Sequence, residues 1–139
     1  MMKNIRLIVL ILTIATLSAC DPIYDAVIKN ESDSNVILQI TFNAESIHPG
    51  GRTYYLSEFP FFERIAPPLK MDTINLICSY VIPPGDNFPI CSEIARYPDY
   101  TLFKELLILK PDSLIYRGQD EISSAFKRTG EFHWVLSNS

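Results

Sequence analysis

Val36-Ile-Leu-Gln-Ile-Thr-Phe-Asn43 is the stretch of this 139-residue sequence that decides the fold class. The side chains at 36, 38, 40 and 42 are apolar and lie on one face of an extended chain, whereas Gln39 and Thr41 lie on the other. A period of two over this length predicts a strand with one buried and one solvated face. The fold built around this strand is therefore expected to be rich in β-structure.

Further alternating segments flank this strand. Residues 24–30 alternate in the same way, and the turn-forming residues at 30–35 predict that the two segments form a hairpin. Additional strands are predicted at 53–56, 73–80, 102–110, 113–117 and 132–136. The apolar run 106–109 predicts a central strand, and a short helix is the alternative there.

One short helix is predicted near the C-terminus, at residues 120–128. Ile122, Ala125 and Phe126 have the spacing of one helical face, and Gly130 is placed to end the helix. A further helical turn is predicted at 92–97. Together with the strands, this helix predicts a mainly β fold, an antiparallel β-sandwich or open barrel with one short helix near the C-terminus.

Two proline-rich segments, 57–70 and 82–100, do not have the pattern of regular elements. Proline within a central strand removes a hydrogen bond from the ladder, so proline-containing strands are confined to sheet edges. Both segments are therefore predicted to be loops or edge strands.

The first twenty residues have the pattern of a secretory signal. Basic residues at 3 and 6 precede the apolar run 7–17, which is followed by the quartet Leu17-Ser-Ala-Cys20. The run is too short for a stable membrane span, which needs about 20 apolar residues. The quartet resembles the lipobox of bacterial lipoproteins, and that resemblance implies cleavage before Cys20 and attachment of lipid to Cys20. A plain secretory signal with a free cysteine is the alternative.

The domain organisation follows: a lipoprotein signal peptide at 1–19, a lipidated cysteine and short tether at 20–25, and a single β-rich domain at 26–139. Cleavage leaves about 120 residues, enough for one domain with its own core.

Two basic residues leave with the signal, so the remaining chain has 10 Lys and Arg against 16 Asp and Glu, a net charge of −6. This balance argues against a nucleic-acid partner and against electrostatic docking on anionic lipid. The membrane is expected to be reached through the attached lipid.

The whole sequence resembles the small Bacteroidetes-type lipoproteins of uncharacterised function. The resemblance lies in the lipobox, the strand and turn at 27–32, the turn at 82–85 and the pattern of the segments between 106 and 134. It implies a compact β-rich domain, anchored by lipid in the cell envelope with the outer membrane favoured, and no established activity. In that group, Asp-Ser/Thr-apolar triplets are O-glycosylation sites, so Thr73 and Ser113 are candidates.

Two cysteines remain in the predicted domain, Cys78 and Cys91. The compartment beyond the inner membrane is oxidising and permits a disulfide between them. Such a bond would close a loop of about fourteen residues and stabilise the fold by roughly 3 kcal/mol. Two buried free thiols are the alternative, and the spacing is not that of a Cys-x-x-Cys redox motif.

No signature of an enzyme or of a metal site is present. The two histidines, His48 and His133, lie in no local motif that pairs either with a nucleophile. The supply of His and Cys is too small for a zinc site. Glu58 and Glu63 flank an aromatic loop, but nothing shows that they converge as glycosidase carboxylates would. We expect no metal, no cofactor and a non-enzymatic role, with an unrecognised hydrolase as an alternative.

The best candidate for a contact surface is the loop that carries Phe59, Phe61, Phe62 and Arg64. Aromatic side chains on an irregular loop can form an interface hot spot or a platform for sugars. The alternative is that they fold back over one end of the sandwich, since exposing three aromatic rings is costly. The first hypothesis is therefore an interaction or accessory module that binds an envelope protein. The second is carbohydrate binding through aromatic residues at 54, 55, 61 and 62.

Overall fold

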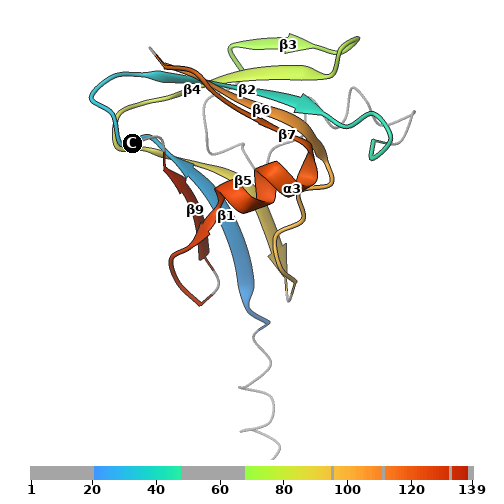
Figure 1. Cartoon of the computed structure of the whole chain (residues 1–139), viewed down its shortest axis with the longest axis vertical. Helices are drawn as coiled ribbons and strands as arrows, with labels where there is room; N and C mark the ends of the chain where they lie inside the picture. Colours follow the sequence, from blue (N-terminus) through green and yellow to red (C-terminus); the bar gives the residue numbers. More distant parts are fainter. Residues whose placement is uncertain (1–20, 48–67, 95, 111, 132, 138–139) are drawn as a thin grey trace, which may run out of the picture.

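Two β-sheets pack face to face, and one short helix lies at their side (Figure 1). The computed structural model describes residues 21–47, 68–94, 96–110, 112–131 and 133–137. Within these residues all strand pairs but one are antiparallel. The predicted sandwich is confirmed, and in the described part of the chain the sheets do not close into a barrel. The predicted strand at 53–56 lies outside the described residues.

The larger sheet has five strands in the order β3-β4-β2-β6-β7. Its strands are β2 (Val36–Phe42), β3 (Lys70–Asp72), β4 (Ile77–Ile82), β6 (Phe103–Leu109) and β7 (Leu114–Arg117). β2 occupies the middle because its inward positions are all apolar, and Val36, Leu38, Ile40 and Phe42 are at most 1% exposed. The run 106–109 is part of a strand with a neighbour on each side, and the helical alternative is wrong.

The smaller sheet has four strands in the order β5-β1-β9-β8. Its strands are β1 (Ile23–Lys29), β5 (Asn87–Ile94), β8 (Lys127–Arg128) and β9 (His133–Ser137). β9 runs parallel to β1, with His133 opposite Asp25 and Leu136 opposite Ile28. The first and last strands of the described chain are therefore neighbours in the interior of this sheet.

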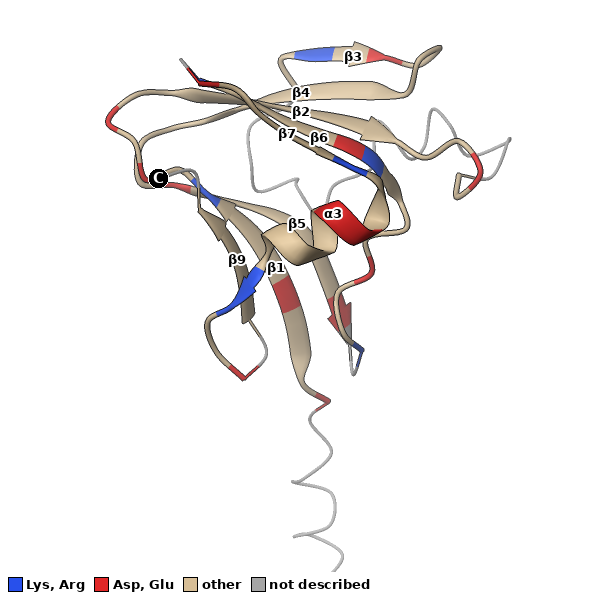
Figure 2. Ribbon diagram, viewed as in Figure 1, with Lys and Arg blue, Asp and Glu red and all other residues tan. Residues whose placement is uncertain are grey.

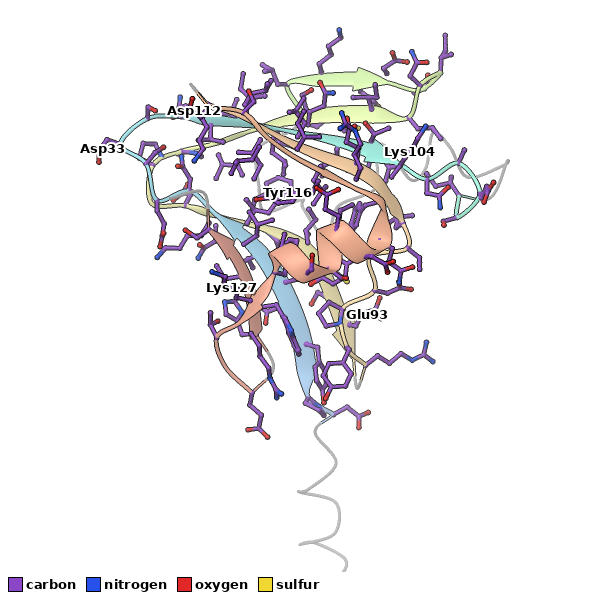
Figure 3. All side chains as sticks on the ribbon, viewed as in Figure 1. Asp33, Glu93, Lys104, Asp112, Tyr116 and Lys127 are labelled. Atoms are coloured by element: carbon purple, nitrogen blue, oxygen red, sulfur yellow. The ribbon has the colours of Figure 1, made fainter. Side chains whose placement is uncertain are left out.

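The core fills the space between the inner faces of the two sheets. Both sheets contribute side chains that are no more than 1% exposed: Ala26, Ile28, Leu38, Ile40, Leu106, Ile108 and Leu136. Figure 3 shows Tyr116 pointing from β7 into the same space. Burying each large apolar side chain stabilises the fold by about 1.5–3 kcal/mol, so the pairing of the sheets is driven by this layer.

Helix α3 (Gly118–Ala125) follows β7 directly and closes one side of the sandwich (Figure 1). Ile122 is completely buried, and the ring of Phe126 lies 5.1 Å from the ring of Tyr100. An eight-residue helix is unstable alone, so these core contacts hold it in place. In the described part of the chain, no helix has the length and apolar character needed to cross a membrane.

The predicted hairpin between 24–30 and 36–43 is wrong, because β1 and β2 belong to different sheets. The chain crosses from one sheet to the other at 30–35 and crosses back at 83–86, between β4 and β5. At the second crossing the N–H of Asp86 donates to the carbonyl of Pro83 at 3.2 Å, and Gly85 has a φ of 76°. Proline before a glycine of positive φ is the pattern of a type II turn.

Asn30 ties the two crossings together. Its side chain is completely buried, and its amide donates to the carbonyls of Ser34 and Ile82, each at 2.8 Å. Its side-chain oxygen accepts from the N–H and the hydroxyl of Ser32. The backbone adds two bonds, between Asn30 N–H and the carbonyl of Asp86 and between Gly85 N–H and the carbonyl of Asn30. The turn formers at 30–35 thus make a corner of the sandwich.

The predicted strand at 73–80 begins later than expected, since β4 starts at Ile77. The carboxylate of Asp72 accepts the N–H groups of Ile74 and Asn75 at 3.0 and 2.9 Å, which bends the chain into a turn. Ile74 is therefore 85% exposed instead of lying on the inner face. Leu76 leaves the turn with a φ of 57° and is buried.

The predicted helical turn at 92–97 is wrong, because residues 92–94 continue β5. β5 is an edge strand, as the proline rule allows, and Pro89 lies beside a register shift between Ala26 and Val27. An edge strand needs only one hydrogen-bonded side, so it tolerates proline.

The helix predicted at 120–128 is shifted: α3 covers Gly118–Ala125, and residues 127–128 form β8 instead. The prediction that Gly130 ends the helix is therefore wrong. Phe126 has an extended backbone conformation, and the chain continues from it into β8, which pairs with β9. The strand predicted at 132–136 is confirmed as β9, one residue further on.

Candidate functional site

The residues that carry the strongest sequence hypotheses lie outside the described residues. Cys20 and the loop with Phe59, Phe61, Phe62 and Arg64 belong to this group. Lipidation of Cys20 and contact through the loop therefore stay predictions. The same holds for the candidate residues at 48, 54, 55, 58 and 63.

The two candidate glycosylation residues lie next to strands of the five-stranded sheet. Thr73 follows β3, Ser113 precedes β7, and both are exposed. Hydrogen bonds from the backbone and side chain of Asn75, and from the backbone of Ile74, hold the pKa of the Asp72 carboxyl below its usual value. The turn around Thr73 is thus ordered with its hydroxyl accessible, and modification of either residue stays a prediction.

Cys78 and Cys91 are free thiols on different sheets. Cys78 is completely buried in β4, and Cys91 is half-buried in β5. Burial raises the pKa of both thiols, to about 11 for Cys91. A thiol with a raised pKa is a poor nucleophile at neutral pH. Neither thiol is bonded in this structure, and the disulfide between Cys78 and Cys91 stays a prediction.

His133 pairs with a carboxylate, but Ser92 is not placed to act as a nucleophile beside it. Its Nδ1 lies 2.8 Å from Oδ2 of Asp25, with side chains 40% and 38% exposed. The strand register places Ser92 on the other side of Asp25. A serine nucleophile needs the histidine within hydrogen-bond reach, yet two strand spacings separate Ser92 from His133, about 9–10 Å. The row of Ser92, Asp25 and His133 across the sheet therefore gives no support to the hydrolase alternative.

The outer face of the five-stranded sheet carries a contiguous apolar surface. Strand register aligns Val81, Ile37 and Leu109 in one row, and Leu107 and Ile115 in the next, which continues across β2 and β4 with the polar residues Gln39 and Ser79. These five side chains are called the apolar face below. Leu109 and Ile115 are 38% and 40% exposed, and the other three are half-buried. Because a sheet with one face on the core usually shows polar residues on the other, and contiguous apolar patches mark interaction sites, this face is the candidate functional surface.

Charged and polar groups border the apolar face at its ends. Figure 2 shows charged residues on β3 and at the ends of β6 and β7, with an uncharged middle between them. At one end, Nε of Arg117 lies 2.7 Å from Oε2 of Glu105, in the same row as Thr41. Beside this ion pair lies an open hollow of about 900 Å³, lined by the end of β2, the turn before β4 and the start of α3.

The hollow itself is a weak candidate for a small-molecule site. The amide of Asn43 already donates to the carbonyl of Thr101, and the amide of Asn75 donates to Asp72. Small-molecule sites combine apolar walls with a few polar groups that converge on the ligand. Since these two amides are engaged within the protein, the hollow is better described as a polar rim of the apolar face.

The sequence held a signal for the apolar face that the strand predictions did not use. The run 106–109 is apolar at four successive positions, so the strand has apolar side chains on both faces. This run predicted a central strand, and that is what β6 is. Only one of its faces packs into the core, however, and Leu107 and Leu109 are left on the other.

Comparisons with known proteins add no relative: no protein-family model, no curated protein and no solved structure matches the chain. Among the described residues, no group of three or more His, Cys, Asp and Glu side chains could hold a metal ion. Fold and surface together define a class, a small β-sandwich with an apolar outer sheet face. That surface and the first twenty residues are the features of the chain that bear on function.

Proposed function

We propose that this chain is a lipid-anchored protein of a bacterial cell envelope, and that its sandwich is a non-enzymatic module that binds a protein partner through the apolar face. The observation that supports the binding role is the exposure of Leu109 and Ile115, which lie in two adjacent rows of the apolar face. The quartet that ends at Cys20 supports the anchoring role.

The layout of the surface suits a protein partner. Removing apolar surface from water contributes about 25 cal/mol per Å², and a typical interface buries about 800 Å² on each partner. Such interfaces have an apolar centre and a polar rim. The apolar face supplies the centre, and the ion pair of Glu105 with Arg117 lies at its edge.

The anchor is tested by metabolic labelling with a palmitate analogue in a host that processes bacterial lipoproteins. We expect label on the wild-type chain and none on Cys20→Ala, because the substitution removes the acceptor sulfur. A chain that stays unlabelled, or a Cys20→Ala chain that still takes up label, would contradict lipidation at this residue.

The binding role is tested by a photo-crosslinking amino acid placed at position 115 and expressed in the native envelope. Position 74 is the matched control, since Ile74 is 85% exposed but lies in the turn before β4, outside the apolar face. We expect one discrete adduct from position 115 that disappears when Leu109→Lys is added, and no such adduct from position 74. Equal adducts from both positions, or none from either, would exclude this face as the contact surface.

Carbohydrate binding stays the alternative prediction. It rests on aromatic residues at 54, 55, 61 and 62, which lie outside the described residues. A glycan array with the purified protein tests it, and specific retention of one sugar class would favour it over a protein partner.

A further inference from the structure

A cluster of three aromatic rings lies at one end of the four-stranded sheet. The ring centroids of Tyr24, Tyr97 and Trp134 are 5.3, 5.6 and 6.0 Å apart. Tyr97 is 64% exposed, and the other two are half-buried. These three residues are called the aromatic cluster below. The cluster extends beyond the buried core and presents aromatic surface to its surroundings.

Strand pairing places this cluster at the end of the molecule where β1 begins. β1 and β9 are parallel, so both start at this end, and β5 finishes there with Ile94 opposite Ile23 (Figure 1). Ile23 is itself 60% exposed. An apolar side chain and three aromatic rings thus surround the point where the chain continues toward residue 20.

Arg128 fixes the ring of Trp134. Its guanidinium carbon lies 5.5 Å from the centroid of that ring, and it donates to the carbonyls of Gly130 and Glu131. A cation above an aromatic face makes an attractive electrostatic contact with the ring. The aromatic cluster is therefore held in its orientation before it meets any partner.

The covalent chain keeps this end close to the lipid-bearing residue. Tyr24 is four residues from Cys20, and four residues span at most about 14 Å. The polar layer on each side of a bilayer is only about 5–8 Å thick. A lipid on Cys20 therefore keeps Tyr24 within about 14 Å of the membrane surface, close enough for the aromatic cluster to reach the polar layer.

We propose that the aromatic cluster and Ile23 lie in the headgroup layer of the membrane, so that the sandwich rests on the bilayer in one fixed orientation. This inference rests on the proposed lipid anchor and adds the surface that meets the membrane. Tyrosine and tryptophan suit that layer because each ring has an apolar body and a polar edge. The apolar face lies on the other sheet and stays available to a partner.

The charges around the cluster define the kind of lipid contact. Asp21, Asp25 and Glu93 lie at this end of the sheet together with the basic residues Arg96 and Arg128. A basic patch that would attract anionic lipid is therefore not present among these residues. The contact is made by ring insertion, so it takes place on zwitterionic lipid and is insensitive to salt.

The test uses intrinsic fluorescence, because Trp134 is the sole tryptophan of the sequence. The lipidated protein, which begins at Cys20 after cleavage, is reconstituted into phosphatidylcholine vesicles, some of which contain lipid brominated near the top of the acyl chains. We expect bromolipid to quench the emission of Trp134, aqueous iodide to quench it weakly, and neither 0.5 M salt nor anionic lipid to change the result. Ile23→Ser should reduce the bromolipid quenching, whereas Ile74→Ser, the same change on the other sheet, should not.

Mass spectrometry of the N-terminal peptide separates the two proposals. If Cys20 carries lipid but Trp134 is quenched by iodide and not by bromolipid, the resting surface is excluded and the anchor stands. If Cys20 carries no lipid, the anchor is excluded and the resting surface with it. If soluble oligosaccharides shift the emission and bromolipid does not, the aromatic cluster is a sugar platform and the inference is overturned.

Discussion

Asn30 shows how one polar side chain can determine where a chain changes sheets. Buried polar groups are tolerated when they are hydrogen-bonded, and both ends of this amide have partners. Those partners come from the 30–35 crossing and from Ile82, the residue that ends β4. The side chain therefore couples two segments that are 52 residues apart in the sequence.

Replacing Asn30 by alanine should destabilise the fold by about 2–4 kcal/mol, because the buried bond to the carbonyl of Ile82 and the bonds to Ser34 and Ser32 are lost together. Urea unfolding at neutral pH measures the change. Asn35→Ala is the control: Asn35 is exposed in the same crossing, and its loss should change the free energy of unfolding by less than about 0.5 kcal/mol. Equal effects of the two substitutions would show that the amide does not hold the corner.

At the scale of elements, α3 depends on the residue at which it begins. Gly118 has a φ of 73°, a conformation that side chains with a Cβ rarely adopt. The carboxylate of Glu121 accepts the N–H of Arg117 at 2.9 Å and fixes the first turn. β7 can pass directly into a helix that turns back over the core because glycine permits this bend.

Gly118→Ala should destabilise the protein by about 1–2 kcal/mol, the cost of the left-handed conformation for a residue with a Cβ. A Cβ at this position would meet no atom within 4 Å, so steric overlap adds nothing. Thermal unfolding measures the change, with Gln119→Ala as the control on the exposed side of the same turn. A Gly118→Ala protein as stable as the wild type would contradict the assigned backbone conformation.

The secondary structure of segment 82–100 was predicted only in part from its sequence. Its prolines predicted loops or edge strands, and β5 is an edge strand with Pro89 in it. The helical turn predicted at 92–97 failed because Ser92 and Glu93 pair with Asp25 and Tyr24 of β1, which are 67 and 69 residues earlier. The spacing of neighbouring residues carries no information about a partner strand so far away in the sequence.

At the scale of the whole molecule, stability should fall in alkaline solution. Burial raises the pKa of Cys91 to about 11 from an ordinary value of 9.0, and raises the pKa of Cys78, Tyr80 and Tyr100 as well. A raised pKa means that the unfolded chain ionises first. The associated stability is therefore complete below about pH 9 and is lost as pH rises toward 11.

Urea unfolding of the reduced protein at pH 7, 9 and 11 checks this expectation. The free energy of unfolding should be nearly constant up to pH 9 and then decrease. Cys91→Ala should make the decrease less steep, since one of the groups that ionises on unfolding is removed. A profile that stays flat to pH 11 in the wild type would show that these groups are already accessible to solvent in the folded state.

The amino-acid pattern by itself determined the strand-rich fold class, the inner face of β2, the strand β6 and the existence of a helix near Ile122. Each of these depends on neighbours within a few residues, where the periods of strands and helices are written directly into the chain. The same local pattern at the N-terminus predicts the lipid anchor.

Only the tertiary structure decided which strands share a sheet. It separated β1 from β2, paired β1 in parallel with β9, and joined Asp25 to His133 and Tyr24 to Trp134. It also left Leu109 and Ile115 on an open face. Alternation along a strand distinguishes its two faces. Which sheet the strand joins, and what each face packs against, depends on core contacts between segments distant in sequence. A local period in the sequence holds no information about those contacts.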